Sequence, residues 1–205
     1  MRLWVAGLAL LALLAGCAGP QPFADETTLA KARYREPGPA SITLYTVVNN
    51  TSGSGGHSAL LINARERIIF DPAGSFFADV VPERNDVLFG ITPAVEAAYR
   101  SAHARTTHHI VSQTLDVTPE QAELLYQLAL AEGATPGAFC TNATSSILAQ
   151  VPGFENIKTV WFPTKLQAQF AQLPGVRTDI YYEGDSADLL DGLRRGNADL
   201  NAQVE

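Results

Sequence analysis

Two residues far apart in the chain, His57 and Cys140, are the best candidates for chemistry. His57 follows a Gly/Ser-rich loop, residues 49–56, and opens an apolar run over residues 57–62. Cys140 comes shortly after Pro136-Gly137, which ends one predicted helix, so Cys140 stands where the next helix begins. A thiolate is the nucleophile in cysteine catalysis, and a helix N-terminus or a neighbouring imidazolium lowers the pKa of the thiol. The pair therefore predicts acyl transfer in which His57 activates Cys140 and then protonates the leaving group.

Asp71 is the candidate for a third group that orients the imidazole. If the strands on either side of the predicted turn at residues 63–66 pair, Asp71 lies across from the His57 end of the neighbouring strand. The alternative is local: in Asp71-Pro72-Ala73-Gly74, Asp, Pro and Gly occupy favoured places of a type I turn, and Asp71 can serve that turn alone.

Four further residues are candidates for substrate binding. Gly56 and Ser58 flank His57, Asn142 follows Cys140 by two positions, and Tyr45 lies on the strand before the Gly-rich loop. A Gly-rich loop beside a catalytic residue lets the backbone of a substrate approach closely. For Tyr45 the alternative is an ordinary aromatic residue of the core.

Cys140 also has a purely structural interpretation. Free cysteine is among the most buried residue types and often packs as a small apolar side chain. On composition alone this interpretation leads, and the position of Cys140 at a helix start and the presence of His57 are what favour chemistry.

The N-terminus predicts export and a lipid anchor. One positive charge at Arg2 precedes an apolar run, residues 3–14, which is the pattern of a secretory signal peptide and is too short to span a bilayer comfortably. The segment Leu14-Ala15-Gly16-Cys17 resembles the lipobox of bacterial lipoproteins. That resemblance implies cleavage before Cys17, acylation of its sulfur and stable membrane attachment. With Ala18 after the cysteine, it implies the outer membrane, facing the periplasm. An ordinary signal peptide with a chance cysteine is the alternative.

Composition and motifs argue against several classes of binding partner. The net charge is −7 and there is no run of Lys and Arg, which argues against nucleic acid as a partner. His108 and His109 are adjacent on a predicted strand and so point to opposite faces, while His103 stands alone in the sequence. No His-Glu-x-x-His or paired-cysteine motif is present. We therefore predict no metal site and no cofactor.

The element pattern predicts one α+β domain. We expect strands at 41–48, 57–62, 67–70, 107–117 and 177–182, and helices at 93–103, 118–132, 140–151 and 164–173. Hairpin-connected strands without regular strand–helix alternation favour an antiparallel sheet packed with helices. We expect residues 1–16 to be the signal peptide, 17–40 a tether, 41–183 the domain, and 184–205 an acidic disordered tail with a short helix at 187–194.

Several short stretches carry a resemblance to a known family. They are Gly56-His57-Ser58-Ala59-Leu60-Leu61, Phe70-Asp71-Pro72-Ala73-Gly74, Leu115-Asp116-Val117-Thr118-Pro119-Glu120-Gln121 and Cys140-Thr141-Asn142. Together they resemble the circularly permuted NlpC/P60 (papain-like) superfamily, and within it the DUF4105 periplasmic-domain group. The resemblance covers about residues 41–150. Where the family pattern has an asparagine before the cysteine, this chain has Phe139.

The resemblance implies a permuted papain-like fold with Cys140 as nucleophile, His57 as base and Asp71 as orienting residue. It implies an envelope thiol hydrolase or acyltransferase that acts on peptidoglycan peptides or on lipid acyl groups. The alternative is a catalytically inactive lipoprotein that uses the same fold for binding or assembly.

Overall fold

The computed structural model describes residues 22–203, and the predicted signal peptide and Cys17 lie outside this range. Its centre is one seven-stranded antiparallel sheet with the strand order β4-β5-β3-β2-β1-β6-β7. The strands are β1 (Ser41–Asn49), β2 (Gly55–Asn63), β3 (Arg67–Phe70), β4 (Glu83–Arg84), β5 (Val87–Phe89), β6 (His108–Asp116) and β7 (Arg177–Tyr182). The α+β prediction is thus confirmed.

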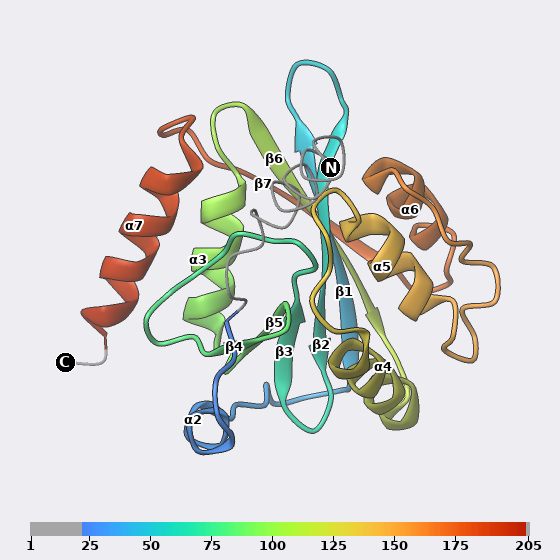
Figure 1. Ribbon diagram of the computed structural model, residues 1–205. Helices are drawn as coiled ribbons and strands as arrows, with labels where there is room; N and C mark the ends of the chain where they lie inside the picture. The colour runs from blue at the N-terminus through green and yellow to red at the C-terminus, as the bar shows by residue number, and fades with distance from the viewer. Residues whose placement is uncertain (1–21, 204–205) are drawn as a thin grey trace, which may run out of the picture.

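Helices cover both faces of the sheet (Figure 1). They are α2 (Glu26–Ala32), α3 (Pro93–His103), α4 (Pro119–Glu132), α5 (Cys140–Leu148), α6 (Pro163–Phe170) and α7 (Leu189–Asn201). Helices α4, α5 and α6 pack on one face, over a core that includes Ile42, Leu44 and Leu60. Helices α3 and α7 pack on the other, over Tyr45, Leu61 and Ile69. Since successive side chains of a strand point to opposite faces, both layers draw on the same central strands.

The helix boundaries follow local signals in the sequence. Thr92 caps α3 through its side chain and Pro93 is its first residue. Thr118 and Gln121 form the predicted capping box of α4, in which each side chain bonds the backbone N–H of the other residue. These signals place α3 and α4 where the sequence predicted them.

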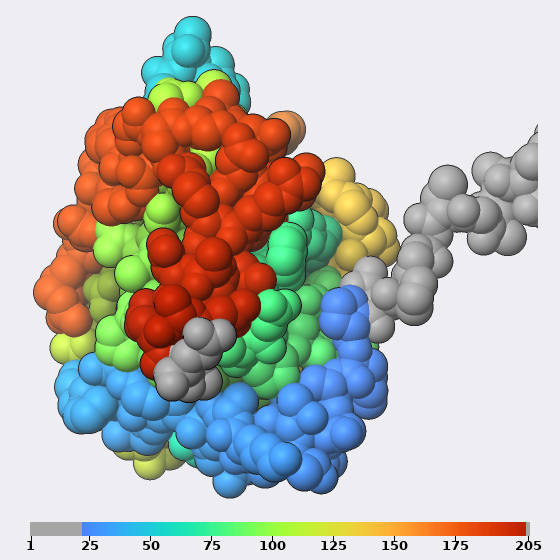
Figure 2. Space-filling model, turned by 90° about the vertical axis from the view of Figure 1, so that its left-hand side faces the viewer, coloured from blue at the N-terminus to red at the C-terminus, as the bar shows by residue number. Residues whose placement is uncertain are grey.

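Two boundaries of the domain differ from the prediction. Residues 22–40, expected to be a tether, pack against the rest of the domain, where they form the blue part of the surface in Figure 2. Phe23 bridges to Arg84, and the Arg67 N–H donates to the Tyr34 carbonyl at 2.6 Å. The expected disordered tail instead contains the long helix α7, which packs on α3. Leu193 and Leu200 are buried there, because their seven-residue spacing puts them on one face of the helix. A helix of this length was not expected because the segment as a whole is acidic and polar, and only a few apolar residues form its buried stripe.

The strands β2 and β3 diverge where the candidate residues lie. Their pairing runs from Asn63 opposite Arg67 to Leu60 opposite Phe70 and ends there. Continued by one residue, this register puts Asp71 opposite Ala59, on the same sheet face as His57. The start of α5 comes down at this end of β2, against Ser58.

Candidate active site

His57 and Asp71 form a hydrogen-bonded ion pair. The Nε2 atom of His57 lies 2.7 Å from Oδ1 of Asp71. The Asp71 side chain is 3% exposed and that of His57 is 15% exposed. The imidazole therefore presents one edge to a buried carboxylate and leaves its other nitrogen, Nδ1, for a second partner.

Helix α3 adds two residues to the site that were not among the predicted ones. The Tyr99 hydroxyl donates to the same Asp71 Oδ1 at 2.7 Å. One turn later, His103 stacks on His57 with ring centroids 5.8 Å apart and an interplanar angle of 11°. His103 stands alone in the sequence, but in the structure it packs against His57. The four-residue spacing of Tyr99 and His103, which puts both on one helix face, was the signal available.

Cys140 is the first residue of α5, as predicted, and it is buried. Phe139 at the N-cap position provides no side-chain hydrogen bond, so the first-turn N–H groups of the helix have no capping partner. Ala138, two residues before Cys140, has a φ of 70°, which a residue with a Cβ seldom adopts. An uncapped helix start after a strained residue presents both the sulfur and a set of N–H donors at one point.

The thiol is fixed to the sheet through its neighbour. Thr141 Oγ1 lies 3.0 Å from Ser58 Oγ, and both side chains are fully buried. The Cys140 sulfur lies 3.8 Å from the same Thr141 oxygen. The contact ties the first turn of α5 to the strand that carries His57.

The charges of the site activate the thiol. Burial opposes a charge on His57, but the carboxylate of Asp71 and the neighbouring thiol together raise the pKa of His57 to about 10. Burial would also raise the pKa of Cys140, yet the neighbouring imidazolium of His57 and the Ser58 backbone lower it to about 7. Thiolate and imidazolium therefore coexist near neutral pH, as thiol catalysis requires.

Asp86 connects the two loops that carry Asp71 and Cys140. Its buried carboxylate oxygen Oδ2 accepts the N–H of Ala73 at 2.9 Å and the N–H of Thr135 at 2.7 Å. The first bond holds the turn that follows Asp71, and the second holds the loop that leads to Cys140. Asp86 is a positioning residue that could not be predicted, because nothing in its local sequence distinguishes it.

The four predicted substrate-binding residues are placed differently from one another. Tyr45 is fully buried and donates to Glu96 at 2.6 Å, so it supports the packing of Tyr99 and does not line the site. Ser58 is likewise buried against Thr141 and is structural. Gly56 is exposed beside His57, and Asn142 is half-buried in the first turn of α5. Only the last two remain candidates for contact with a substrate.

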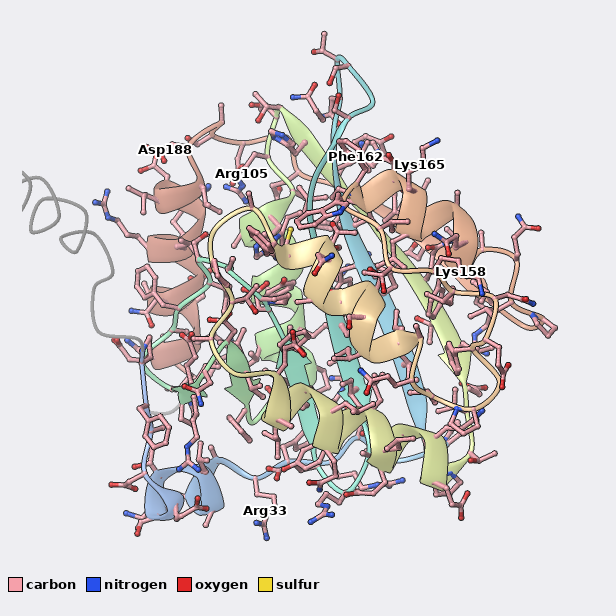
Figure 3. The ribbon with its side chains drawn as sticks, turned by 45° about the vertical axis from the view of Figure 1, so that its right-hand side comes forward. Arg33, Arg105, Lys158, Phe162, Lys165 and Asp188 are labelled. Atoms are coloured by element: carbon pink, nitrogen blue, oxygen red, sulfur yellow. The ribbon has the colours of Figure 1, made fainter. Side chains whose placement is uncertain are left out.

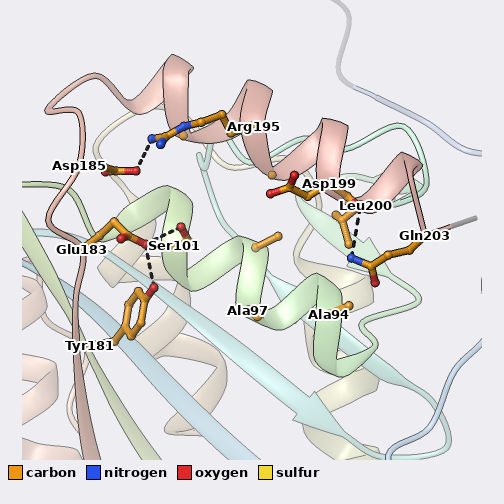
Figure 4. Close-up of a pocket in the computed structure, with 13 residues that line it drawn as sticks. Ala94, Ala97, Ser101, Tyr181, Glu183, Asp185, Arg195, Asp199, Leu200 and Gln203 are labelled. Atoms are coloured by element: carbon orange, nitrogen blue, oxygen red, sulfur yellow. Dashed lines mark hydrogen bonds and ion pairs between the residues drawn. The ribbon is translucent and has the colours of Figure 1, made fainter.

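A cavity of about 340 Å³ opens beside the two imidazoles. Its lining includes His57, His103, Gly56, Gly74 and Arg105. A second cavity, of about 440 Å³, lies between α3, α7 and the end of β7 (Figure 4). Small residues such as Ala97 and carboxylates such as Glu183 line it, and no histidine or cysteine does. Of these two cavities only the first is lined by His57 and His103, and Cys140 lines neither of them.

Comparison with family models, curated proteins and solved structures found no match to this chain. Within residues 22–203, none of the helices has both the length and the apolar character needed to cross a bilayer.

Proposed function

We propose that this protein is a thiol-dependent acyl hydrolase or acyltransferase, attached to the bacterial cell envelope through a lipid on Cys17. The observation that carries the proposal is the convergence of Asp71, His57 and Cys140, with the thiol at a helix start and its pKa lowered to about 7. The resemblance to permuted papain-like enzymes supports the same assignment of roles.

In the first half of the proposed reaction, the Cys140 thiolate attacks the carbonyl carbon of an ester or amide. The uncapped N–H groups at the start of α5 stabilise the oxyanion that forms. His57 then gives its proton to the departing alcohol or amine, and the acyl group remains on Cys140 as a thioester.

In the second half, His57 takes a proton from water or from an acceptor alcohol or amine, which attacks the thioester. The Cys140 thiolate leaves and the imidazolium forms again. Asp71 stays ionised throughout, because the charge of His57 keeps its pKa low despite burial. Water as the acceptor makes the protein a hydrolase, and another acceptor makes it a transferase.

Exposed aromatic side chains next to Cys140 favour a lipid acyl group over a peptide as the substrate. Phe139, directly before the nucleophile, is 41% exposed and packs edge-on against Trp161, with ring centroids 4.9 Å apart. Trp161 is 54% exposed and Phe162 is 67% exposed. Phe162 lies at the start of α6 (Figure 3). We call these three residues the aromatic rim. Large apolar side chains that stay exposed beside a reactive group provide a surface for an apolar substrate.

Trapping the acyl intermediate tests the proposal. Residues 18–205, which retain Cys140 as their one cysteine, are incubated with an activated long-chain ester such as a p-nitrophenyl ester and examined by mass spectrometry. We expect one acyl group on Cys140, none on Cys140→Ser, and slower acylation of His57→Ala. Equal acylation of Cys140→Ser, or no acylation of the unsubstituted chain by esters or by peptidoglycan peptides, would favour the non-enzymatic alternative.

A further inference from the structure

The buried end of the site carries a second arrangement that thiol chemistry does not use. One atom from each of His57, Asp71 and His103 lies within 4.8 Å of the corresponding atoms of the other two. Two imidazole nitrogens and a carboxylate oxygen are the ligand set that Zn²⁺ and related first-row cations take in sites with an open coordination position. Two ligands about 2.1 Å from a tetrahedral ion lie roughly 3.4 Å apart, so small side-chain rotations would bring the three atoms to one ion.

The hydrogen bonds of Tyr99 prepare two of these ligands. The Nδ1 atom of His103 lies 2.9 Å from the Tyr99 carbonyl. A carbonyl oxygen only accepts hydrogen bonds, so Nδ1 carries the hydrogen and Nε2 is left with a free lone pair. The Tyr99 hydroxyl donates to Asp71 and fixes the carboxylate. Support of this kind, with the second imidazole nitrogen bound to a carbonyl, is characteristic of histidines that bind metals.

The surroundings admit an ion and shield it. His57 and His103 both line the cavity of about 340 Å³, so an ion can reach their nitrogens from solvent. On the inner side, the rings of Phe76 and Tyr99 pack against His103, with centroids 6.5 and 4.3 Å from its own. An apolar wall behind the ligands and an open cavity before them suit a bound ion that keeps water at its remaining positions.

From this geometry we infer that His57, Asp71 and His103 form a binding site for one divalent transition-metal ion, with Zn²⁺ and Co²⁺ as the probes. The ion would replace the proton on Nε2 of His57, which passes to solvent. Cys140 is outside this ligand set. On the proposed function, the bound metal would be a reversible inhibitor, because His57 would lose its contact with Asp71 and the positive charge that favours the thiolate.

The test measures metal binding directly and needs no activity. Residues 18–205 are titrated with Co²⁺, followed by visible absorption, and with Zn²⁺ in competition with a chromophoric chelator. We expect one equivalent bound and no thiolate-to-cobalt charge-transfer band. His103→Gln should weaken binding at least tenfold, and Tyr99→Phe, which loses only a supporting hydrogen bond, about tenfold. His109→Gln, a histidine substitution outside the cluster, and Cys140→Ser should both bind as the unsubstituted chain does.

The outcomes separate this inference from the proposed function. Absence of binding, or equal affinity in folded His103→Gln, overturns the metal site whatever Cys140 does. If His103→Gln does not fold, Tyr99→Phe decides, and unchanged affinity in that variant overturns the site. Alkylation of Cys140 without metal tests the proposed function independently. If both hold, Zn²⁺ should slow alkylation at least tenfold in the unsubstituted chain and leave His103→Gln unaffected.

Discussion

The Nε2 atom of His57 lies 2.7 Å from Oδ1 of Asp71, at the point where β2 and β3 stop pairing. This bond gives the site its electrostatics: Asp71 raises the pKa of His57, and His57 in turn lowers that of Cys140. Tyr99 donates a hydrogen bond to the Asp71 carboxylate, and Asp86 fixes the turn that follows Asp71. Substitutions that remove one of these interactions, or one side chain of the aromatic rim, should therefore change the reactivity of Cys140 or the turnover of an ester.

Asp71→Asn removes the negative charge and keeps the shape of the side chain. The pKa of His57 should fall and that of Cys140 should rise, because the imidazolium loses its counter-charge. We expect turnover of an activated ester to fall on the order of 10²-fold or more, as when a general base is disabled. Steady-state kinetics measures this, with Asp199→Asn, an exposed carboxylate on α7, as the matched control. Unchanged kcat/KM in Asp71→Asn would mean that Asp71 only stabilises the turn at residues 71–74.

Gly74→Ala should displace the carboxylate of Asp71. A Cβ atom at position 74 would overlap both Asp71 carboxylate oxygens, whereas one at Gly137 would meet nothing within 4 Å. We expect a loss of about 1–3 kcal/mol in unfolding free energy, typical of overpacking. The same variant should lose most of its Cys140 reactivity. Gly137→Ala, in the loop before Cys140, serves as the control in both assays, chemical denaturation and thiol alkylation. If the two alanine variants behave alike, the packing of Gly74 against Asp71 is not what holds the carboxylate.

Asp86→Ala and Asp86→Asn should differ. Both hydrogen bonds of Asp86 end on one oxygen, Oδ2, so an asparagine carbonyl oxygen in that place can accept both N–H groups. We expect Asp86→Ala to lose about 1–3 kcal/mol for the unsatisfied buried groups, together with most of the activity, and Asp86→Asn to recover much of each. Thermal unfolding and kcat against KM are the readouts. Full activity in Asp86→Ala would show that the two loops hold their places without this link.

The aromatic rim should select acyl chain length. Phe139→Ser and Trp161→Ala should each lower kcat/KM for long-chain esters about tenfold. Each substitution removes apolar contact with the acyl chain, and the loss of contact to a single methylene group already lowers kcat/KM by about that factor. The value for an acetyl ester should change little, because that acyl group is too short to reach the rim. A comparison of acetyl and long-chain esters in each variant measures the effect. Equal losses for both chain lengths would assign the rim to folding and not to substrate selection.

Much of the fold was predictable because its signals are local. The capping box at Thr118 and Gln121, the proline at the start of α3 and the apolar runs of β1 and β2 each act within a few residues. Strands β4 and β5 escaped prediction because they are two and three residues long and depend on pairing with β3. Helix α7 was underestimated because its stability comes from burying Leu193 and Leu200 among mostly polar neighbours.

The candidate site divides in the same way. His57, Asp71 and Cys140 could be proposed from their places at the ends of predicted elements. The roles of Tyr99, His103 and Asp86 could not, because each depends on how distant elements pack. Tyr45 and Ser58 were candidates for substrate contact, but they point to opposite faces of the sheet and helices cover both faces, so both side chains are buried.

The alkylation rate of Cys140 as a function of pH tests the central claim most directly. It is measured with iodoacetamide on residues 18–205 and on the His57→Ala variant. A raised pKa of His57 keeps the imidazolium present up to about 10, and a lowered pKa of Cys140 keeps the thiolate present down to about 7. The rate should therefore rise through about pH 7 and then level off, and His57→Ala should move this rise to higher pH, because burial without the imidazolium raises the pKa of the thiol. A thiol that is unreactive in the folded protein, or that titrates near the free value of about 8.5 with or without His57, would contradict the account.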